Sequence, residues 1–121
     1  MKVSFAFYCN IDLIGISCIV RLLLSHTYYI YNIIMEIYES KRKDKRFMAI
    51  IKGKKYHFGL KNGSTYIDHK DELKRHNYIK SHIVNEDWLK INAGSLSRYL
   101  LWGHSTSLEK NINDYIKRFN L

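Results

Sequence analysis

The stretch FMAIIKGKKYHFGL, residues 47–60, decides the fold. Its first five residues, 47–51, are all apolar and have the length and composition of a buried strand. The polar segment KGKK, residues 52–55, follows as a tight turn whose glycine tolerates a positive φ. Residues 56–60 then return as a second strand, so the whole stretch predicts a β-hairpin.

The segments beside this hairpin extend the prediction in both directions. Residues 35–40 form a short helical or extended lead-in. Asn62-Gly63 favours a turn after the hairpin, and residues 65–67 are a candidate third strand. After Ile67 the apolar residues recur about every 3.6 positions instead of every second one, which predicts helices.

Three helices are expected in the second half of the chain, and each has a candidate capping residue in front of it. These pairs are Asp68 with an amphipathic helix 69–83, Ser95 with a helix 96–102 ended by Gly103, and Thr106 or Ser107 with a helix 108–119. The predicted fold class is therefore α+β, with a small N-terminal β-hairpin or three-stranded meander followed by about three packed α-helices.

Composition indicates one small basic domain. The chain has 121 residues, a formal charge of +9 and 46% hydrophobic residues, which suits a single modest core and is too small for a TIM barrel. A charged fraction of 26% with 14% aromatic residues is also too apolar for intrinsic disorder. Residues 1–34 contain only three charged side chains, whereas residues 35–121 contain all the others, so we place the domain at 35–121.

The apolar segment 1–34 has four open interpretations. Its apolar stretch, Leu13–Leu24, is interrupted by Arg21 and is shorter than the roughly 18–20 residues of a spanning helix. The segment is a cleaved signal peptide, a membrane anchor formed by residues 11–34, a leader ahead of a start at Met35, or an N-terminal helix packed on the domain. The change of composition at Met35 favours the leader.

No catalytic motif is evident in the sequence. The two cysteines, Cys9 and Cys18, lie too far apart for a CxxC metal site and too close to the N-terminus for a disulfide scaffold. The segment AGSLS, residues 93–97, does not match the G-x-S-x-G nucleophile elbow, and no phosphate-binding glycine loop is present. We therefore expect a non-enzymatic protein with no catalytic residues, cofactor or metal.

A group of histidine and aspartate residues leaves a small metal-dependent nuclease as a minor alternative. Its members are His57, Asp68, His69, Asp71, His76 and His82. Their spacings match no zinc motif, and buried or solvated histidines with ordinary hydrogen bonds explain them more simply.

Nucleic-acid binding is the better functional hypothesis. Residues 41–61 contain nine cations opposed only by Asp44, and many of them lie beside the turns of the hairpin, where lysine and arginine reach phosphates. These cations are Lys41, Arg42, Lys43, Lys45, Arg46, Lys52, Lys54, Lys55 and Lys61. The aromatic side chains among and after them, Tyr56, His57, Phe58 and Tyr66, are candidates for stacking on bases. The alternative is that the lysines only solubilise a small sheet.

Three residues of the last 34 have expected structural roles. Arg98 interrupts an apolar helix and is expected to pair with Glu86 or Asp87. Trp88 and Trp102 are expected to anchor the core.

Several motifs carry a resemblance. HFG at 57–59, HKD at 69–71, EDW at 86–88 and AGSLSRYLLW at 93–102 resemble the pattern of an uncharacterised family of small proteins found in large nucleocytoplasmic DNA viruses. The similarity covers about residues 46–119, and the chain departs from it at residues 81 and 83–84, where such relatives tend to be basic. The resemblance implies a viral protein and transfers no activity. For a viral protein the expected location is the host cytoplasm or the virion, and a membrane location stays open.

The expected partners remain open among three classes. They are DNA or RNA through the basic hairpin, viral structural proteins, and a membrane through residues 11–34.

Overall fold

The computed structural model describes residues 2–4, as backbone only, and residues 35–121. Four antiparallel strands form one sheet in the order β1-β2-β3-β4, and these strands are β1 Lys2–Ser4, β2 Met35–Glu39, β3 Lys45–Ile51 and β4 Lys54–Leu60. Of the segment 1–34, for which four interpretations are open, residues 1 and 5–34 lie outside the described residues. Among the described helices, none is long and apolar enough to cross a membrane.

The hairpin predicted from residues 47–60 is confirmed. β3 and β4 pair in register from Lys45 opposite Leu60 to Ile51 opposite Lys54. Between them lies a two-residue turn in which Lys52 has φ 51° and Gly53 has φ 80°. Two successive positive φ values match the right-handed twist of the paired strands, which is why short hairpins favour this turn.

The third strand lies before the hairpin, not after it. β2 pairs with β3, so the lead-in 35–40 is extended. Residues 65–67, expected as a strand, instead begin the short helix α4, Tyr66–His69. The Thr65 backbone N–H and hydroxyl both donate to the Asp68 carboxylate, at 2.9 and 2.8 Å, and this capping arrangement overrides the strand preference of Thr, Tyr and Ile.

The helices of the second half are α5 Glu72–His82, α6 Ala93–Leu96, the π-helical turn η1 Ser97–Leu101, and α7 Leu108–Arg118. Asp71, not Asp68, caps α5 by accepting from the backbone N–H groups of Leu73 and Lys74. Asn92 caps α6. Ser95, the expected cap, lies inside the helix at the third position, where it completes a capping box with Asn92. Ser107 caps α7 as predicted.

Gly103 follows η1 for a different reason from the one expected. It does not have the positive φ of a helix-ending glycine. An added Cβ would lie 2.3 Å from the carbonyl oxygen of Tyr99 and 2.7 Å from the Asn111 side chain, so close packing requires glycine here.

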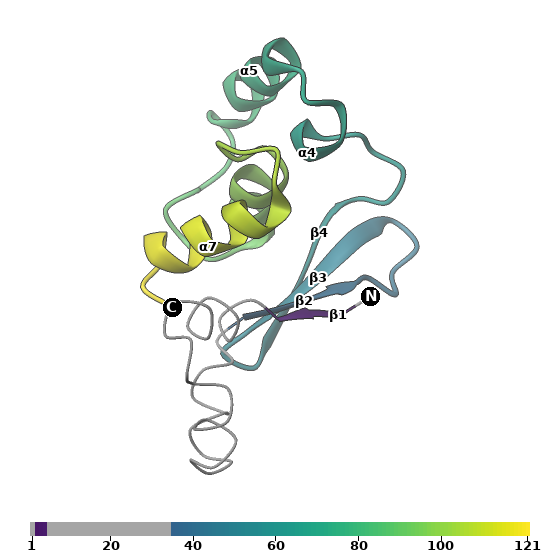
Figure 1. Cartoon of the computed structure of the whole chain (residues 1–121), viewed down its shortest axis with the longest axis vertical. Helices are drawn as coiled ribbons and strands as arrows, with labels where there is room; N and C mark the ends of the chain where they lie inside the picture. The colour runs from purple at the N-terminus through teal and green to yellow at the C-terminus, as the bar shows by residue number, and fades with distance from the viewer. Residues whose placement is uncertain (1, 5–34) are drawn as a thin grey trace, which may run out of the picture.

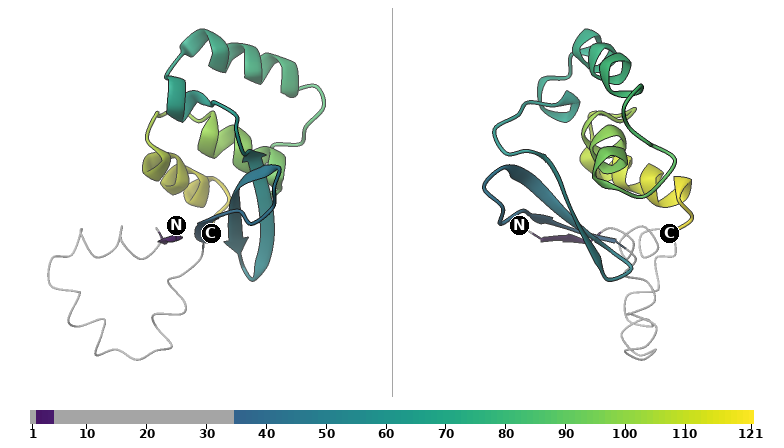
Figure 2. Two further views of the ribbon diagram at one scale, coloured as in Figure 1. Left: turned by 90° about the vertical axis from the view of Figure 1, so that its right-hand side faces the viewer. Right: turned by 180° about the vertical axis from the view of Figure 1, so that it is seen from behind.

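The described helices lie on one side of the sheet, with α6, η1 and α7 nearest to it and α4 and α5 beyond the end of β4 (Figures 1 and 2). The core between these layers combines inward side chains of β2–β4 with one face of α6, η1 and α7. Its fully buried members are Met35, Ile37, Ala49, Ile51, Phe58, Leu96, Leu100, Leu101, Ile112 and Tyr115. This two-layer arrangement confirms the predicted α+β class.

Candidate nucleic-acid interface

Eight of the nine cations of residues 41–61 divide into two groups at opposite ends of the β3–β4 hairpin. We call the first group the turn cluster. It consists of Lys41, Arg42, Lys43, Lys45 and Lys61. It lies at the β2–β3 connection, where the Lys61 N–H donates to the Asp44 carbonyl at 3.2 Å. The tip cluster lies at the other turn and consists of Lys52, Lys54 and Lys55. Since β3 has seven residues, at about 3.3 Å each the two clusters are roughly 20 Å apart.

Arg46, the ninth cation, is committed to an ion pair. Its guanidinium donates to both carboxylate oxygens of Asp68, at 2.7 and 2.8 Å. The Arg46 hydrogen bonds, with help from Thr65, hold the pKa of Asp68 well below its usual value, although partial burial opposes them. The pKa of Arg46 is raised by the same contact. Arg46 therefore ties β3 to α4 and is poorly placed to bind a phosphate.

Of the four predicted stacking residues, three lie on β4 and the fourth, Tyr66, lies in α4. Phe58 and Tyr66 are buried, and Tyr56 packs against the core, so these three are not available to bases. The reason is the alternation of a strand, which directs residues 56 and 58 to the covered face and residue 57 to the other face. Of the four, His57 alone lies on the other face, which none of the described helices covers and which we call the uncovered face; its Nδ1 lies 2.8 Å from the Ser40 hydroxyl.

A hollow of about 360 Å³ lies on the uncovered face of the sheet. Its apolar floor is made by Met48 and Ile50 of β3, and two rings, Tyr38 and His57, stand beside it. Lys41 of the turn cluster and Lys55 of the tip cluster also line it, together with Glu39. The hollow thus connects the two basic clusters. Sequence reasoning missed Tyr38, although its alternation with buried Met35 and Ile37 in β2 was a usable signal.

The histidines and aspartates of the suspected metal group are dispersed. In the described part of the chain, no set of three or more His, Cys, Asp or Glu side chains could hold a metal ion. Asp68 pairs with Arg46, and Asp71 caps α5. His69 accepts from the Asp71 N–H through Nδ1, at 2.9 Å, and His76 is exposed.

Arg98 does not form the expected pair with Glu86 or Asp87. Its Nη1 donates to the carbonyl of Trp102 at 2.9 Å, and its guanidinium lies over the rings of Trp88 and Tyr99. Burial and the nearby Arg75 lower the pKa of Arg98. Its structural role therefore consists of holding the end of η1, where backbone carbonyls lack helical partners.

Of the two tryptophans expected to anchor the core, only Trp102 packs against it. Trp88 lies outside the core cluster, with its indole N–H donating to Glu86 at 2.7 Å.

An aromatic stack that no sequence pattern indicated attaches α5 to η1. Tyr78 lies parallel to Trp102, with ring centroids 4.3 Å apart, and His82 stacks on the other face of Tyr78 at 4.0 Å. Arg75, a residue not singled out from the sequence, donates through Nε to the carbonyls of Trp102 and Gly103. The contacts to Trp102 and Gly103 connect residues more than 20 positions apart, so local pattern could not reveal them.

Comparison with known proteins adds a family match without a function. A family of unknown function (DUF5754) matches residues 35–82, the segment from β2 through α5. The chain is similar to that family over this segment, which includes both basic clusters and the hollow of the uncovered face. No curated protein and no solved structure matches the chain.

Proposed function

We propose that this protein is a small non-enzymatic nucleic-acid-binding module that uses the uncovered face of its sheet. The observation that carries the proposal is the hollow lined by Lys41 and Lys55, one from each basic cluster, with Tyr38 and His57 between them. A cationic surface with interspersed rings suits a single strand, because phosphates bind the cations while bases contact the rings.

The polar groups around His57 favour an anionic ligand. The Ser40 hydroxyl accepts from the Arg42 backbone N–H at 3.1 Å and can donate to His57 Nδ1. In that tautomer the ring proton is on Nε2, which becomes a donor for a phosphate oxygen. Lys41 and Lys55 have no ion-pair partner among the described residues, so binding a phosphate would break no ion pair within that part of the chain.

The resemblance of residues 46–119 to viral proteins supports viral DNA or RNA as the ligand. Attachment to viral structural proteins is the alternative partner class, and it predicts no affinity for an isolated oligonucleotide.

The test is binding of the full chain to labelled single-stranded and duplex oligonucleotides at about 50 and 200 mM salt, a range over which phosphate contacts weaken steeply. The variant Lys41→Ala/Lys55→Ala should bind less tightly. The slope of the logarithm of its binding constant against the logarithm of salt concentration should become shallower by about one for each phosphate that is no longer bound. The control Lys110→Ala/Lys117→Ala removes the same charge from exposed positions of α7 and should retain most of the affinity. Equal reductions in affinity in both variants, or no binding at low salt, would overturn the proposal.

A further inference from the structure

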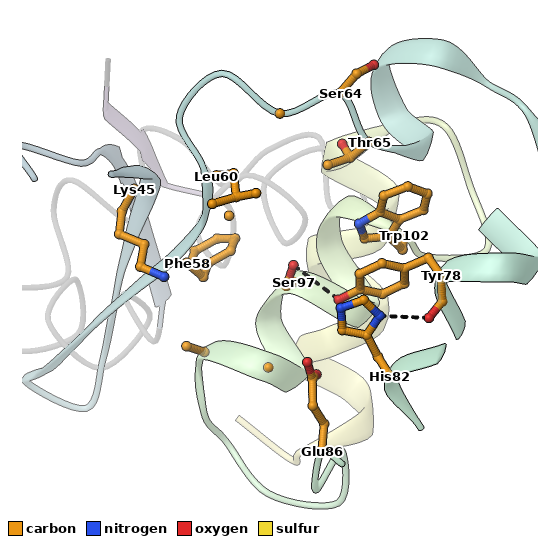
Figure 3. Close-up of a pocket in the computed structure, with 14 residues that line it drawn as sticks. Lys45, Phe58, Leu60, Ser64, Thr65, Tyr78, His82, Glu86, Ser97 and Trp102 are labelled. Carbon is orange, nitrogen blue, oxygen red and sulfur yellow. Dashed lines mark hydrogen bonds between the residues drawn. The ribbon is translucent and has the colours of Figure 1, made fainter. Parts of the chain in front are cut away.

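A second cavity lies at the β4 edge of the described sheet, beside the turn cluster. It has a volume of about 380 Å³, which is in the range of ligand pockets in proteins. Its walls come from Phe58 to Leu60 of the sheet, from Tyr78 and His82 of α5, and from Ser97 and Trp102 (Figure 3). Lys45 of the turn cluster lines it as well, so the cavity opens where cations are already gathered.

Two charged groups reach this cavity from different walls, and both have unused bonding capacity. Lys45 extends its ammonium group from β3 toward Phe58 (Figure 3) and has no ion-pair partner among the described residues. Glu86 directs its carboxylate toward Ser97 and His82. Its Oε2 accepts from the Trp88 indole N–H, which fixes the side chain, whereas Oε1 has no hydrogen bond within the described part of the chain.

The space around the Glu86 carboxylate depends on Gly94. An added Cβ at Gly94 would lie 2.8 Å from Oε2 and 3.2 Å from the Asn92 amide oxygen. Glycine therefore allows a carboxylate to lie against the start of α6, held in place by Trp88. The fixed carboxylate has one oxygen free to accept, and the same cavity is lined by the rings of Tyr78, His82 and Trp102. This combination favours a ligand with an N–H donor and a flat apolar face.

We propose that this cavity receives one unstacked base of a bound single strand and that Glu86 selects bases with an exocyclic amino group. The cavity lies on the helix-covered side of the sheet, at its β4 edge. The inference rests on the proposed function, since it requires the strand bound on the uncovered face to continue round that edge and place one base in the cavity. The free Oε1 accepts from the amino group, as Glu does from cytosine N4 in known readout. The ammonium of Lys45 and the hydroxyl of Ser97 supply donors for the ring nitrogen and carbonyl acceptors of such a base.

Uracil makes the sharpest comparison, because it has the ring of cytosine with a carbonyl oxygen at position 4. That oxygen would face the Glu86 carboxylate without a proton between them, leaving two acceptors opposed. We expect deoxycytidine oligonucleotides to bind about tenfold more tightly than deoxyuridine oligonucleotides of equal length, the effect of about one hydrogen bond to a charged group.

The experiment measures both affinities by fluorescence anisotropy with the full chain and with Glu86→Gln. Glutamine keeps its amide oxygen as the acceptor for the Trp88 N–H and presents its NH2, a donor, to the ligand in place of the free carboxylate oxygen. The ratio of deoxycytidine to deoxyuridine affinity should therefore fall to one or below. The control Glu109→Gln removes the same charge from an exposed position on α7 and should leave the ratio unchanged. Using the ratio removes the general gain in affinity that follows the loss of a negative charge.

A second variant tests the cavity without changing charge. Ala93 lines the cavity and is exposed, so Ala93→Phe fills the space and should abolish the preference while deoxyuridine binding persists. Equal binding of both oligonucleotides by the unmodified chain would overturn the subsite and leave the proposed function intact. Failure of both to bind would overturn the proposed function, and with it this inference.

Discussion

At the residue scale, Asp68 shows how one carboxylate can join two elements. It accepts from Arg46 of β3 and from Thr65 at the start of α4. Asp68→Asn removes the charge of the pair and weakens the cap, so at pH 7 we expect the free energy of unfolding to fall by about 1–2 kcal/mol, a partly exposed ion pair and a helix cap each contributing modestly. Urea denaturation measures this loss, and Asp114→Asn, at an exposed position of α7, is the control.

The same residue predicts a dependence on pH. Because the folded state lowers the pKa of Asp68, its contribution is fully present above the unfolded pKa of about 3.9 and is lost as the pH falls toward the folded value. The difference in unfolding free energy between the natural chain and Asp68→Asn should therefore be smaller at about pH 3 than at pH 7, because part of the stabilisation by the charged Asp68 carboxylate is lost at the lower pH. A difference that stays constant over this range would contradict the assignment.

At the scale of elements, α5 is unusual because it has no buried residue. Leu73, one of its apolar residues, is 68% exposed, so the amphipathic pattern predicted for 69–83 does not describe how the helix is held. Tyr78 and Arg75 hold it instead, through the Trp102 ring and the carbonyls after η1. α5 is therefore attached by few contacts and should open independently of the core.

Hydrogen exchange tests that independence. In Tyr78→Ala, the amides of α5 should exchange about tenfold faster, the effect of losing one aromatic pair, while those of β3 and β4 keep their protection. The control Lys74→Ala changes an exposed side chain of the same helix and should have little effect. A uniform rise in exchange across helix and sheet would show that α5 and the core unfold as one unit.

The elements that the sequence predicted well are those set by local chemistry. The β3–β4 turn follows from Gly53 and its neighbours, and α7 follows from the apolar residues at helical spacing behind the Ser107 cap. Residues 65–67 were mispredicted because a four-residue capping box outweighs strand propensity. The basic residues of the candidate site were found by composition, but their division into two clusters and the cavity at β4 arise from tertiary packing, which local patterns do not encode.

At the scale of the whole molecule, Trp102 is where the stack holding α5 meets the core. Its ring contacts Tyr78 and His69 on the α4–α5 side, and the residue also packs against the buried cluster of the sheet and helices. Replacing it with alanine removes apolar burial from the core and the support of α5 together. We expect Trp102→Ala to lower the free energy of unfolding by about 3–5 kcal/mol, a large part of the stability of a small domain.

Thermal unfolding followed by circular dichroism distinguishes a global role of Trp102 from a local one. If Trp102 supports the whole domain, the transition stays cooperative and its midpoint falls far more than in Tyr78→Ala, which removes the stack but leaves the core side of Trp102 in place. If Trp102 serves only the attachment of α5, the two variants should show similar small shifts, and near-natural thermal stability of Trp102→Ala would refute its place in the core. The comparison works because both substitutions break the same ring contact and only one of them also removes packing against the sheet and helices.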